Sequence, residues 1–299
     1  MFRQDLKADF EALLPGQTTE AGATRRTALK AALGVGYAAA ALPVMAQTSI
    51  RTPADGLVTG EVTYEVGGFK VPAYRAAPEG RFGLPVVLVL SEVFGVHEYI
   101  ADTARRFARA GYLAIAPELF ARQGEPTEYG ELARLMAEVV DQVPDAQVMA
   151  DLDGAVKWAG ANGGDVRKLG VTGFCWGGRL AWLYAAHNPD VKAGVAWYGR
   201  LVGEASPLTP KHPLDIAGRL HGPVLGLYAG DDPSIPLDTV AKMKAALAVG
   251  NAASRASQFV VYPDAPHAFH ADYRPSYDKA AAEDGWQRAL AWFRQHGVA

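Results

Sequence analysis

The sequence predicts one α/β domain, built on a mainly parallel, doubly wound sheet with helices on both faces. From residue 60 onward, short apolar runs alternate with longer segments of helical periodicity, which is typical of repeated strand–helix–strand units. Hydrophobic residues make up 49% of the 299 residues and charged residues 20%, which excludes disordered, collagen-like and coiled-coil proteins. No internal repeat or second-domain linker interrupts this pattern.

The expected elements begin with a hairpin, in which segments 61–66 and 69–75 flank the turn residues Gly67 and Gly68. The apolar run 86–90 then has the character of a strand buried on both faces. Further strands are expected at 112–116, 169–172, 193–197, 224–228 and 259–262. Helices are expected at 99–110, 131–140, 145–159, 179–187, 239–248 and 280–295. Right-handed crossovers between parallel strands should place these helices on both faces of the sheet.

The first 46 residues have the layout of an export signal that is separate from this domain. Arg25 and Arg26 precede an Ala-rich apolar stretch that ends near Leu42, and a cleavage position follows Ala46. The arginine pair resembles a twin-arginine signal, although Ala28 stands where that pattern prefers Phe. We therefore expect a signal peptide over 1–46, a lead-in over 47–58 and the domain over 59–299.

A functional signal implies the twin-arginine translocase as a partner during export and a periplasmic or other extracytoplasmic location. The apolar stretch is too short and too rich in Ala and Gly to stay inserted in a bilayer. The alternative is a cytoplasmic protein whose N-terminal helix contains an accidental arginine pair. A net charge of −3 without a basic run argues against a nucleic acid or an anionic membrane as partner.

Cys175 is the single cysteine, so the chain cannot form an internal disulfide or a Cys-rich zinc site. It lies in the pentapeptide G-F-C-W-G between an expected strand and an expected helix, which is the pattern of a nucleophile on a sharp turn. The helix N-terminus favours a thiolate, and the N–H of Trp176 is free to donate to an oxyanion. A buried structural cysteine is the alternative interpretation.

An acid and a histidine follow later strands, in the chain order nucleophile, acid, histidine. Asp232 follows one strand, and the spacing of its loop favours it over Asp231, with a solvated turn as the alternative. His267 follows the last expected strand and is the expected general base. A Zn or Fe site made by His267, His270 and Asp272 is another interpretation, but its spacing matches no specific metal motif.

Together these features resemble the dienelactone hydrolase family over roughly residues 60–295. The elbow G-F-C-W-G-G is the most specific match, because generic esterases have Ser in place of Cys175. The family's glutamate-bearing, arginine-bearing and histidine-bearing segments are matched by L-S-E-V-F-G at 90–95, L-F-A-R-Q at 119–123 and P-H-A-F-H at 266–270. The resemblance implies an α/β-hydrolase fold and chemistry that requires no cofactor or metal.

The resemblance also implies a role for each matching residue. Cys175 would be the nucleophile, His267 the base and Asp232 the acid that orients the base. Glu92 would activate the thiol, and Arg122 would bind a substrate carboxylate. Taken alone, Glu92 also fits a helix cap or an ion pair with a surface Lys, and Arg122 also fits an exposed loop position. The remaining implied positions are the oxyanion donors Trp176 and Val93 and a substrate-binding Arg274, with an orientation away from the substrate as the alternative for Arg274 because it comes seven residues after His267. Tyr198 is a further candidate for substrate binding, with a core position as the alternative.

The activity that the resemblance implies is a carboxylic ester hydrolase of the carboxymethylenebutenolidase kind. Such an enzyme opens a small unsaturated lactone, from dienelactone to a maleylacetate-type product, by Cys-His-Asp acyl transfer. One alternative is an exported general carboxylesterase or thioesterase with the same triad, and another is a non-catalytic binding protein with an α/β-hydrolase fold. The best-known family members are cytosolic, so the export signal and the N-terminal hairpin favour a broader branch whose activities vary.

Overall fold

The computed structural model describes residues 50–299, so the predicted signal at 1–46 lies outside the described residues. The strands are β1 (Leu57–Val66), β2 (Phe69–Pro78), β3 (Leu84–Leu90), β4 (Leu113–Pro117), β5 (Gly164–Phe174), β6 (Val191–Trp197), β7 (Val224–Asp231) and β8 (Gln258–Pro266). The α-helices are α5 (Glu98–Arg109), α6 (Leu132–Glu138), α7 (Asp145–Ala161), α8 (Trp176–His187), α9 (Pro213–Ile216), α10 (Leu237–Ala248), α11 (Ala252–Ala256) and α12 (Lys279–Gln295). Short 3₁₀ turns are η1 (Pro126–Glu128), η2 (Val140–Gln142) and η3 (Ala217–Arg219).

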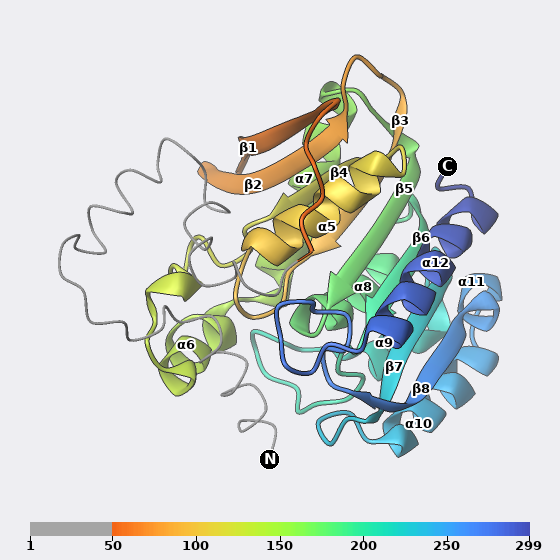
Figure 1. Ribbon diagram of the computed structural model, residues 1–299. Helices are drawn as coiled ribbons and strands as arrows, with labels where there is room; N and C mark the ends of the chain where they lie inside the picture. Colours follow the sequence, from red (N-terminus) through yellow and green to blue (C-terminus); the bar gives the residue numbers. More distant parts are fainter. Residues whose placement is uncertain (1–49) are drawn as a thin grey trace.

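The strands form one twisted sheet in the order β1-β2-β4-β3-β5-β6-β7-β8 (Figure 1). The predicted hairpin pairs β1 with β2 in antiparallel register, and β2 also runs antiparallel to β4. From β4 across to β8 every neighbouring pair is parallel. The predicted mainly parallel sheet is therefore confirmed, and the carboxyl ends of its parallel strands share one edge, where sites in such folds form.

Helices cover both faces of this sheet, as predicted. In Figure 1, α5 and α12 lie on one face, and the rings of Phe107 and Trp286 join these two helices with centroids 4.5 Å apart. On the opposite face α7 and α8 are neighbours, joined by a 2.9 Å hydrogen bond from Tyr184 Oη to Asp153. None of the helices within residues 50–299 combines the length and the apolar character needed to cross a membrane.

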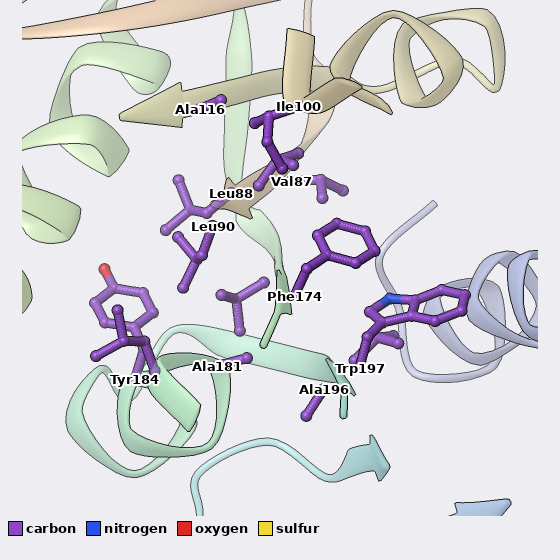
Figure 2. Close-up of a cluster of buried hydrophobic side chains, with 14 of the residues drawn as sticks. Val87, Leu88, Leu90, Ile100, Ala116, Phe174, Ala181, Tyr184, Ala196 and Trp197 are labelled. Carbon is purple, nitrogen blue, oxygen red and sulfur yellow. The ribbon is translucent and has the colours of Figure 1, made fainter. Parts of the chain in front are cut away.

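The core forms where the alternating side chains of the central strands meet these helices. Figure 2 shows Val87 of β3 on the side of Ile100 from α5, whereas Leu90 points toward the α8 residue Tyr184. The rings of Phe174 and Trp197, at the ends of β5 and β6, stack with centroids 5.5 Å apart. Because full burial of one such side chain contributes about 1.5–3 kcal/mol, this cluster holds the strand ends in fixed positions.

The bounds of helices α6 and α8 differ from the prediction for identifiable structural reasons. The expected helix 131–140 ends earlier, because Val139 leaves the helical region at φ −122° and ψ −68° and a 3₁₀ turn follows. Helix α8 begins at Trp176, three residues before its expected start. Gly177 and Gly178 lower helix propensity there, but close packing against neighbouring backbone overrides that preference.

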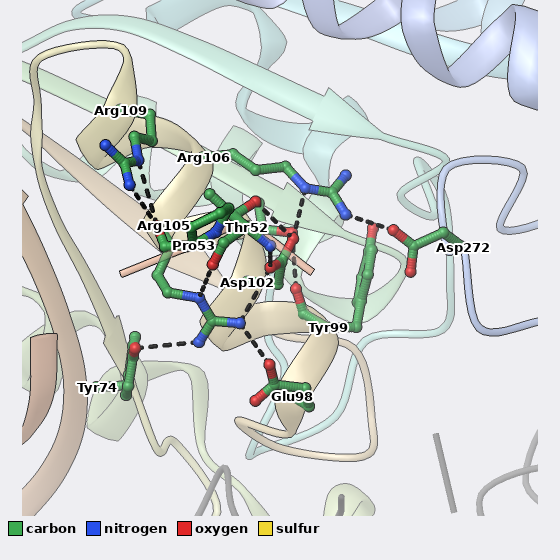
Figure 3. A network of polar contacts seen from close by, with 11 residues as sticks. Thr52, Pro53, Tyr74, Glu98, Tyr99, Asp102, Arg105, Arg106, Arg109 and Asp272 are labelled. Carbon is green, nitrogen blue, oxygen red and sulfur yellow. Dashed lines mark hydrogen bonds and ion pairs between the residues drawn. The ribbon is translucent and has the colours of Figure 1, made fainter. Parts of the chain in front are cut away.

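A buried polar network attaches the described part of the lead-in to helix α5 (Figure 3). Asp102 accepts hydrogen bonds from the N–H and, at 3.1 Å, from the hydroxyl of Thr52. The same carboxylate pairs with Arg105 at 3.0 Å and with Arg106 at 2.6 Å. Arg106 also pairs with Asp272, which lies in the segment after β8. The network therefore joins the lead-in, α5 and the segment after β8.

Candidate active site

Cys175 lies at a strained turn between β5 and α8. Its φ of 52° is in the left-handed region that residues other than Gly seldom occupy. Neighbouring glycines make the turn possible, because a Cβ atom on Gly173 would lie 2.1 Å from the carbonyl oxygen of Gly177. A Cβ atom on Gly177 would lie 2.4 Å from the carbonyl oxygen of Leu90. The glycine pattern therefore lets the elbow approach the ends of β3 and β5 closely.

The surroundings of the thiol match those of an activated cysteine. Cys175 is 5% exposed, and its N–H donates to the carbonyl oxygen of Trp197 at 3.0 Å. The thiol stands directly before the first turn of α8, where unpaired N–H groups and the helix dipole favour negative charge. Trp176 is the first residue of that helix, so its N–H has no partner within the helical ladder.

Asp232 and His267 lie in contact, although they are 35 positions apart in the sequence. Oδ2 of Asp232 lies 2.6 Å from Nδ1 of His267. Asp232 is buried whereas Asp231 is exposed, so burial favours Asp232 over Asp231 as the partner of His267. The N–H of Ser234 donates to the other carboxylate oxygen of Asp232 at 2.9 Å and fixes its orientation.

The electrostatics of His267 link it to the thiol. Burial by itself lowers the pKa of His267, but attraction to the Cys175 thiolate and the hydrogen bond with Asp232 outweigh burial and raise that pKa to about 10. Burial raises the pKa of Asp232, and the interactions with His267 and Ser234 outweigh it and bring that pKa below its ordinary value. Nε2 of His267 is buried, and a side-chain interaction with Cys175 is among the causes of the raised pKa of His267. The arrangement favours the protonated imidazole of His267 next to the thiol.

Glu92 lies in the loop 91–97 between β3 and α5 and is fully buried. Its Oε1 is 3.0 Å from a guanidinium nitrogen of Arg274, and its Oε2 accepts a hydrogen bond from Tyr273 Oη at 2.7 Å. Nε2 of His97 is 3.6 Å from the same Oε2. Burial raises the pKa of Glu92, but Arg274 and His97 outweigh it and lower that pKa to about 2. Glu92 is therefore an ionised carboxylate inside the protein, and no described hydrogen bond joins it to Cys175.

Arg274 is 3% exposed and faces the inside of the protein. Besides its ion pair with Glu92, it donates from Nε to Tyr273 Oη at 3.0 Å. Its guanidinium carbon also lies 5.2 Å from the ring centroid of Phe94. The structure thus brings Arg274 to Glu92, where its planar charge is balanced by that carboxylate.

Arg122 occupies a different environment. Its guanidinium donates two hydrogen bonds to the carboxylate of Asp151 on α7, at 2.5 and 2.8 Å. It also lies over the ring of Phe69 at 4.3 Å from the centroid, next to the β1–β2 turn. Its side chain is 22% exposed. No contact within the described chain joins Arg122 to Cys175, Glu92 or His267.

The remaining predicted positions, Val93 and Tyr198, are both buried. The N–H of Val93 takes part in no hydrogen bond within the described part of the chain. Tyr198 has a φ of 38°, and its ring meets that of His267 edge-on with centroids 5.2 Å apart. Its hydroxyl is buried and interacts with Tyr99. The structure therefore brings Tyr198 to the histidine and leaves the Val93 N–H available as a donor.

The three side chains of the alternative metal site each contact a different partner. His267 pairs with Asp232, Nδ1 of His270 lies 2.6 Å from Tyr99 Oη, and Asp272 pairs with Arg106. Residues 50–299 contain no group of three His, Cys, Asp or Glu side chains arranged to hold a metal ion. The three side chains therefore point to three different partners and do not converge.

Sequence reasoning missed three side chains of this region: Ser234, Tyr273 and His97. Ser234 stands two residues after Asp232, a spacing at which an N–H commonly bonds to an Asp side chain, so it had a usable signal. Tyr273 and His97 had no such signal. Tyr273 is distant in the sequence from Glu92, the partner that both side chains share, and His97 is the N-cap residue of α5.

Comparisons with known proteins identify the family of the chain. The model of the dienelactone hydrolase family matches residues 71–297. A protein of Methylorubrum extorquens, named "Putative carboxymethylenebutenolidase", is 54% identical over 291 residues, which cover 97% of this chain and 99% of that protein. The crystal structure of a "Putative Dienelactone Hydrolase" from Klebsiella pneumoniae has a TM-score of 0.78 at 57% identity, covering 80% of this chain and 99% of that chain.

A more distant structure agrees in fold alone. Esterase 2 of Thermogutta terrifontis is 15% identical, with a TM-score of 0.63 over 83% of this chain and 97% of that chain. The predicted α/β-hydrolase fold and the predicted hydrolytic enzyme of the carboxymethylenebutenolidase kind are confirmed. With a family match over most of its length and relatives above 50% identity, the chain belongs to the dienelactone hydrolase family.

Proposed function

We propose that Cys175, His267 and Asp232 hydrolyse a small unsaturated lactone or a related ester by acyl transfer. The observation that carries this proposal is the pairing of an elbow cysteine with a buried His–Asp pair whose imidazole pKa is raised by the thiolate. Imidazolium next to thiolate provides the nucleophile without a separate proton acceptor. Glu92, a fully buried carboxylate, keeps the role of thiol activation in this proposal.

The first half-reaction forms a thioester. The Cys175 sulfur attacks the lactone carbonyl carbon, and the N–H groups of Trp176 and Val93 stabilise the negative oxygen that develops. The carbonyl re-forms as the ring C–O bond breaks, and the ring oxygen leaves as an enolate. The enolate takes the proton of the His267 imidazolium and becomes a ketone, which leaves His267 neutral for the second half-reaction. An enolate is a better leaving group than an alkoxide, so a thiolate is an adequate nucleophile.

The second half-reaction uses water. His267 accepts a proton from water while the water oxygen attacks the thioester carbonyl carbon. The C–S bond breaks, Cys175 leaves as thiolate, and the acyl group becomes a carboxylate. Asp232 holds the imidazole in the tautomer and orientation that this proton transfer needs. One water is consumed for each lactone opened.

The substrate proposal is tested by following the ultraviolet absorbance of cis- and trans-dienelactone with the protein that begins at Gln47. We expect loss of absorbance with the wild-type protein and no loss above background with Cys175→Ala. A neutral aryl ester is assayed in parallel with both proteins. Hydrolysis of the aryl ester without hydrolysis of either lactone would contradict the assignment of a lactone as substrate. It would still agree with the proposed roles of Cys175, His267 and Asp232.

A neutral ester is the second candidate substrate, and the engagement of both predicted arginines favours it. Arg122 is held by Asp151, and Arg274 is held by Glu92. A carboxylated lactone would have to displace one of these carboxylates in order to reach a guanidinium. If Arg122 binds the substrate carboxylate, Arg122→Ala raises KM for dienelactone and leaves KM for the aryl ester unchanged. Equal kinetics of Arg122→Ala and wild type on the lactone would exclude that role.

We also propose that residues 1–46 direct export of the folded chain, on the evidence of their sequence pattern. Expression of the full chain in a bacterium with a twin-arginine pathway should give periplasmic protein whose N-terminus is Gln47. The double substitution Arg25→Lys and Arg26→Lys should retain the protein in the cytoplasm. Equal periplasmic fractions of the two proteins would contradict this proposal.

A further inference from the structure

Glu118 is a buried carboxylate that the proposed mechanism does not use. It follows the last residue of β4, is 4% exposed, and its N–H donates to the carbonyl oxygen of Pro72 on β2 at 2.8 Å. Because β4 and β3 are neighbours in the sheet, the Glu118 side chain reaches the loop 91–97 that leaves β3. No local sequence pattern marks this residue, which is a Glu between Pro117 and Leu119.

The contacts of Glu118 are with backbone N–H groups. Its Oε2 accepts from the N–H of Val96 at 2.7 Å, and its Oε1 accepts from the N–H of Phe120 at 3.3 Å. Gly95 lies against the same carboxylate, since a Cβ atom built there would be 2.7 Å from Oε2. The φ of Gly95 is +74°, so both its conformation and its lack of a side chain suit this contact.

The carboxylate has no cationic partner within residues 50–299. Burial raises the pKa of Glu118 to about 7, and the hydrogen bonds from Val96 and Phe120 only partly oppose that rise. Above pH 7 the charged form is therefore held mainly by two N–H donors. Burying a carboxylate costs free energy, and an apolar residue would avoid this cost if the position served packing alone.

The loop that Glu118 contacts carries two residues of the proposed mechanism. Gly95 donates from its N–H to the carbonyl oxygen of Glu92 at 3.4 Å, and the N–H of His97 donates to the carbonyl oxygen of Gly95 at 3.1 Å. These tight turns connect Val96 to the Glu92–Val93 segment through few rotatable bonds. A fixed Val96 N–H therefore restricts where the Val93 N–H points.

We propose that Glu118 is a positioning residue that orients the Val93 N–H toward the carbonyl oxygen of a group bound to Cys175. This inference rests on the proposed function and adds the side chain that sets the geometry of one oxyanion donor. Oxyanion donors act only when they are already oriented, and loss of one such donor lowers rates by about 10²–10³-fold in other hydrolases. Misorientation of the donor should produce a smaller loss of the same kind.

The test compares two reactions of the same thiol at pH 8. Acylation of Cys175 by a neutral nitrophenyl ester, measured as the pre-steady-state burst, needs the oxyanion donors. Alkylation of Cys175 by iodoacetamide needs the thiolate but forms no oxyanion. In Glu118→Gln the amide offers one acceptor oxygen and turns an NH₂ group toward the other N–H. We therefore expect acylation about 10–100-fold slower than in wild type, with alkylation within about twofold.

Glu125→Gln is the matched control. Burial likewise raises the pKa of Glu125 to about 7, and its carboxylate accepts a hydrogen bond from the N–H of Thr127, but it makes no described contact with loop 91–97. Both rates should stay within about twofold of wild type in this variant. Acylation of Glu118→Gln at the wild-type rate would overturn the inference. Acylation and alkylation reduced by the same factor would also overturn it, because that result places the effect on the thiolate or on the fold.

A second variant tests the same contact from the other side. Gly95→Ala places a methyl group against the Glu118 carboxylate and should slow acylation selectively as well. If both variants act through one contact, the double variant should lose little more than the worse single variant. Multiplied losses would overturn the shared contact. A wild-type protein that is alkylated at Cys175 but neither hydrolyses nor forms an acyl adduct with any ester would instead overturn the proposed function, and the positioning role of Glu118 with it.

Discussion

The residues of the candidate site divide into a strained nucleophile and two buried ion pairs. Cys175 occupies a left-handed backbone position next to a helix N-terminus. Asp232 with His267 forms one pair, and Glu92 with Arg274 forms the other. In each pair a charged partner overcomes the effect of burial on a pKa, which is a recurrent property of functional sites.

The first prediction concerns Asp232→Asn. Removal of the carboxylate takes away one interaction that raises the pKa of His267, so that pKa should fall from about 10. An Asn side chain also favours the wrong imidazole tautomer, and kcat should fall about 10²–10⁴-fold. Titration of the His267 ring by NMR and steady-state kinetics measure the two effects. Asp231→Asn, at the exposed neighbouring position, is the control and should match wild type in both measurements.

The second prediction concerns the stability contributed by Glu92. Its pKa is lowered from 4.5 to about 2 in the folded protein, so its contribution is present above pH 4.5 and is lost as the pH falls toward 2. Glu92→Gln leaves Arg274 buried without its carboxylate and should lower the free energy of unfolding by about 3–5 kcal/mol at pH 7. The difference from wild type should shrink as the pH falls below 4.5. Urea unfolding at several pH values measures it, and a difference independent of pH would contradict the ion pair.

For single residues, the sequence predicted which residues belong to the site better than it predicted which side chains they contact. Cys175, Asp232 and His267 each lie in a local pattern that fixes a turn, so they could be found without the fold. Arg122 also has a local pattern, but its partner Asp151 belongs to a distant helix and had no signal. The same limit applies to Glu118, whose role depends on which strand lies beside β4.

Among the elements, the turn from β5 to α8 places the thiol. Gly177 lies in the first turn of α8 against the carbonyl oxygen of Leu90, so the helix and the end of β3 touch without side chains between them. The Trp197 carbonyl at the end of β6 receives the Cys175 N–H. Three strand ends therefore determine the position of one sulfur atom.

The third prediction follows from that packing. In Gly177→Ala the new Cβ would lie 2.4 Å from the carbonyl oxygen of Leu90, so the helix or the strand must move. We expect a loss of roughly 3 kcal/mol in the free energy of unfolding, measured by urea titration. Gly130→Ala is the control, because nothing lies within 4 Å of its Cβ position and its φ is not in the left-handed region. Equal stabilities of the two variants would show that the elbow tolerates a side chain.

Element types were predictable where the hydrophobic pattern is strong. The central strands and the long helices α5, α7 and α12 form where they were expected, although β5 begins at Gly164, before the expected start at 169. The exceptions are segments whose structure depends on tertiary contacts. The glycine-rich start of α8 is helical because it packs on β3 and β6, and the short helices α9 and α11 are too brief to show a period.

For the whole molecule, the sheet order brings together segments that are far apart in the chain. Loop 91–97, the Cys175 elbow, the Asp232 loop and the His267 segment all follow parallel strands that end at the same edge. The segment after β8 is further joined to α5 through the pair of Asp272 with Arg106 (Figure 3). Sequence reasoning reached the shared edge from fold class alone, but it could not assign the strand order that sets Glu118 beside loop 91–97.

The central claim is that Cys175 carries the acyl group during turnover. Intact-mass spectrometry of the protein quenched during hydrolysis of a neutral aryl ester tests this claim most directly, with peptide mapping of the adduct. The account predicts an added acyl mass on the peptide that contains Cys175, absent from Cys175→Ala and accumulating in His267→Ala, where the thioester is not hydrolysed. Ester hydrolysis by Cys175→Ala at the wild-type rate, with no adduct on the wild-type peptide, would contradict it.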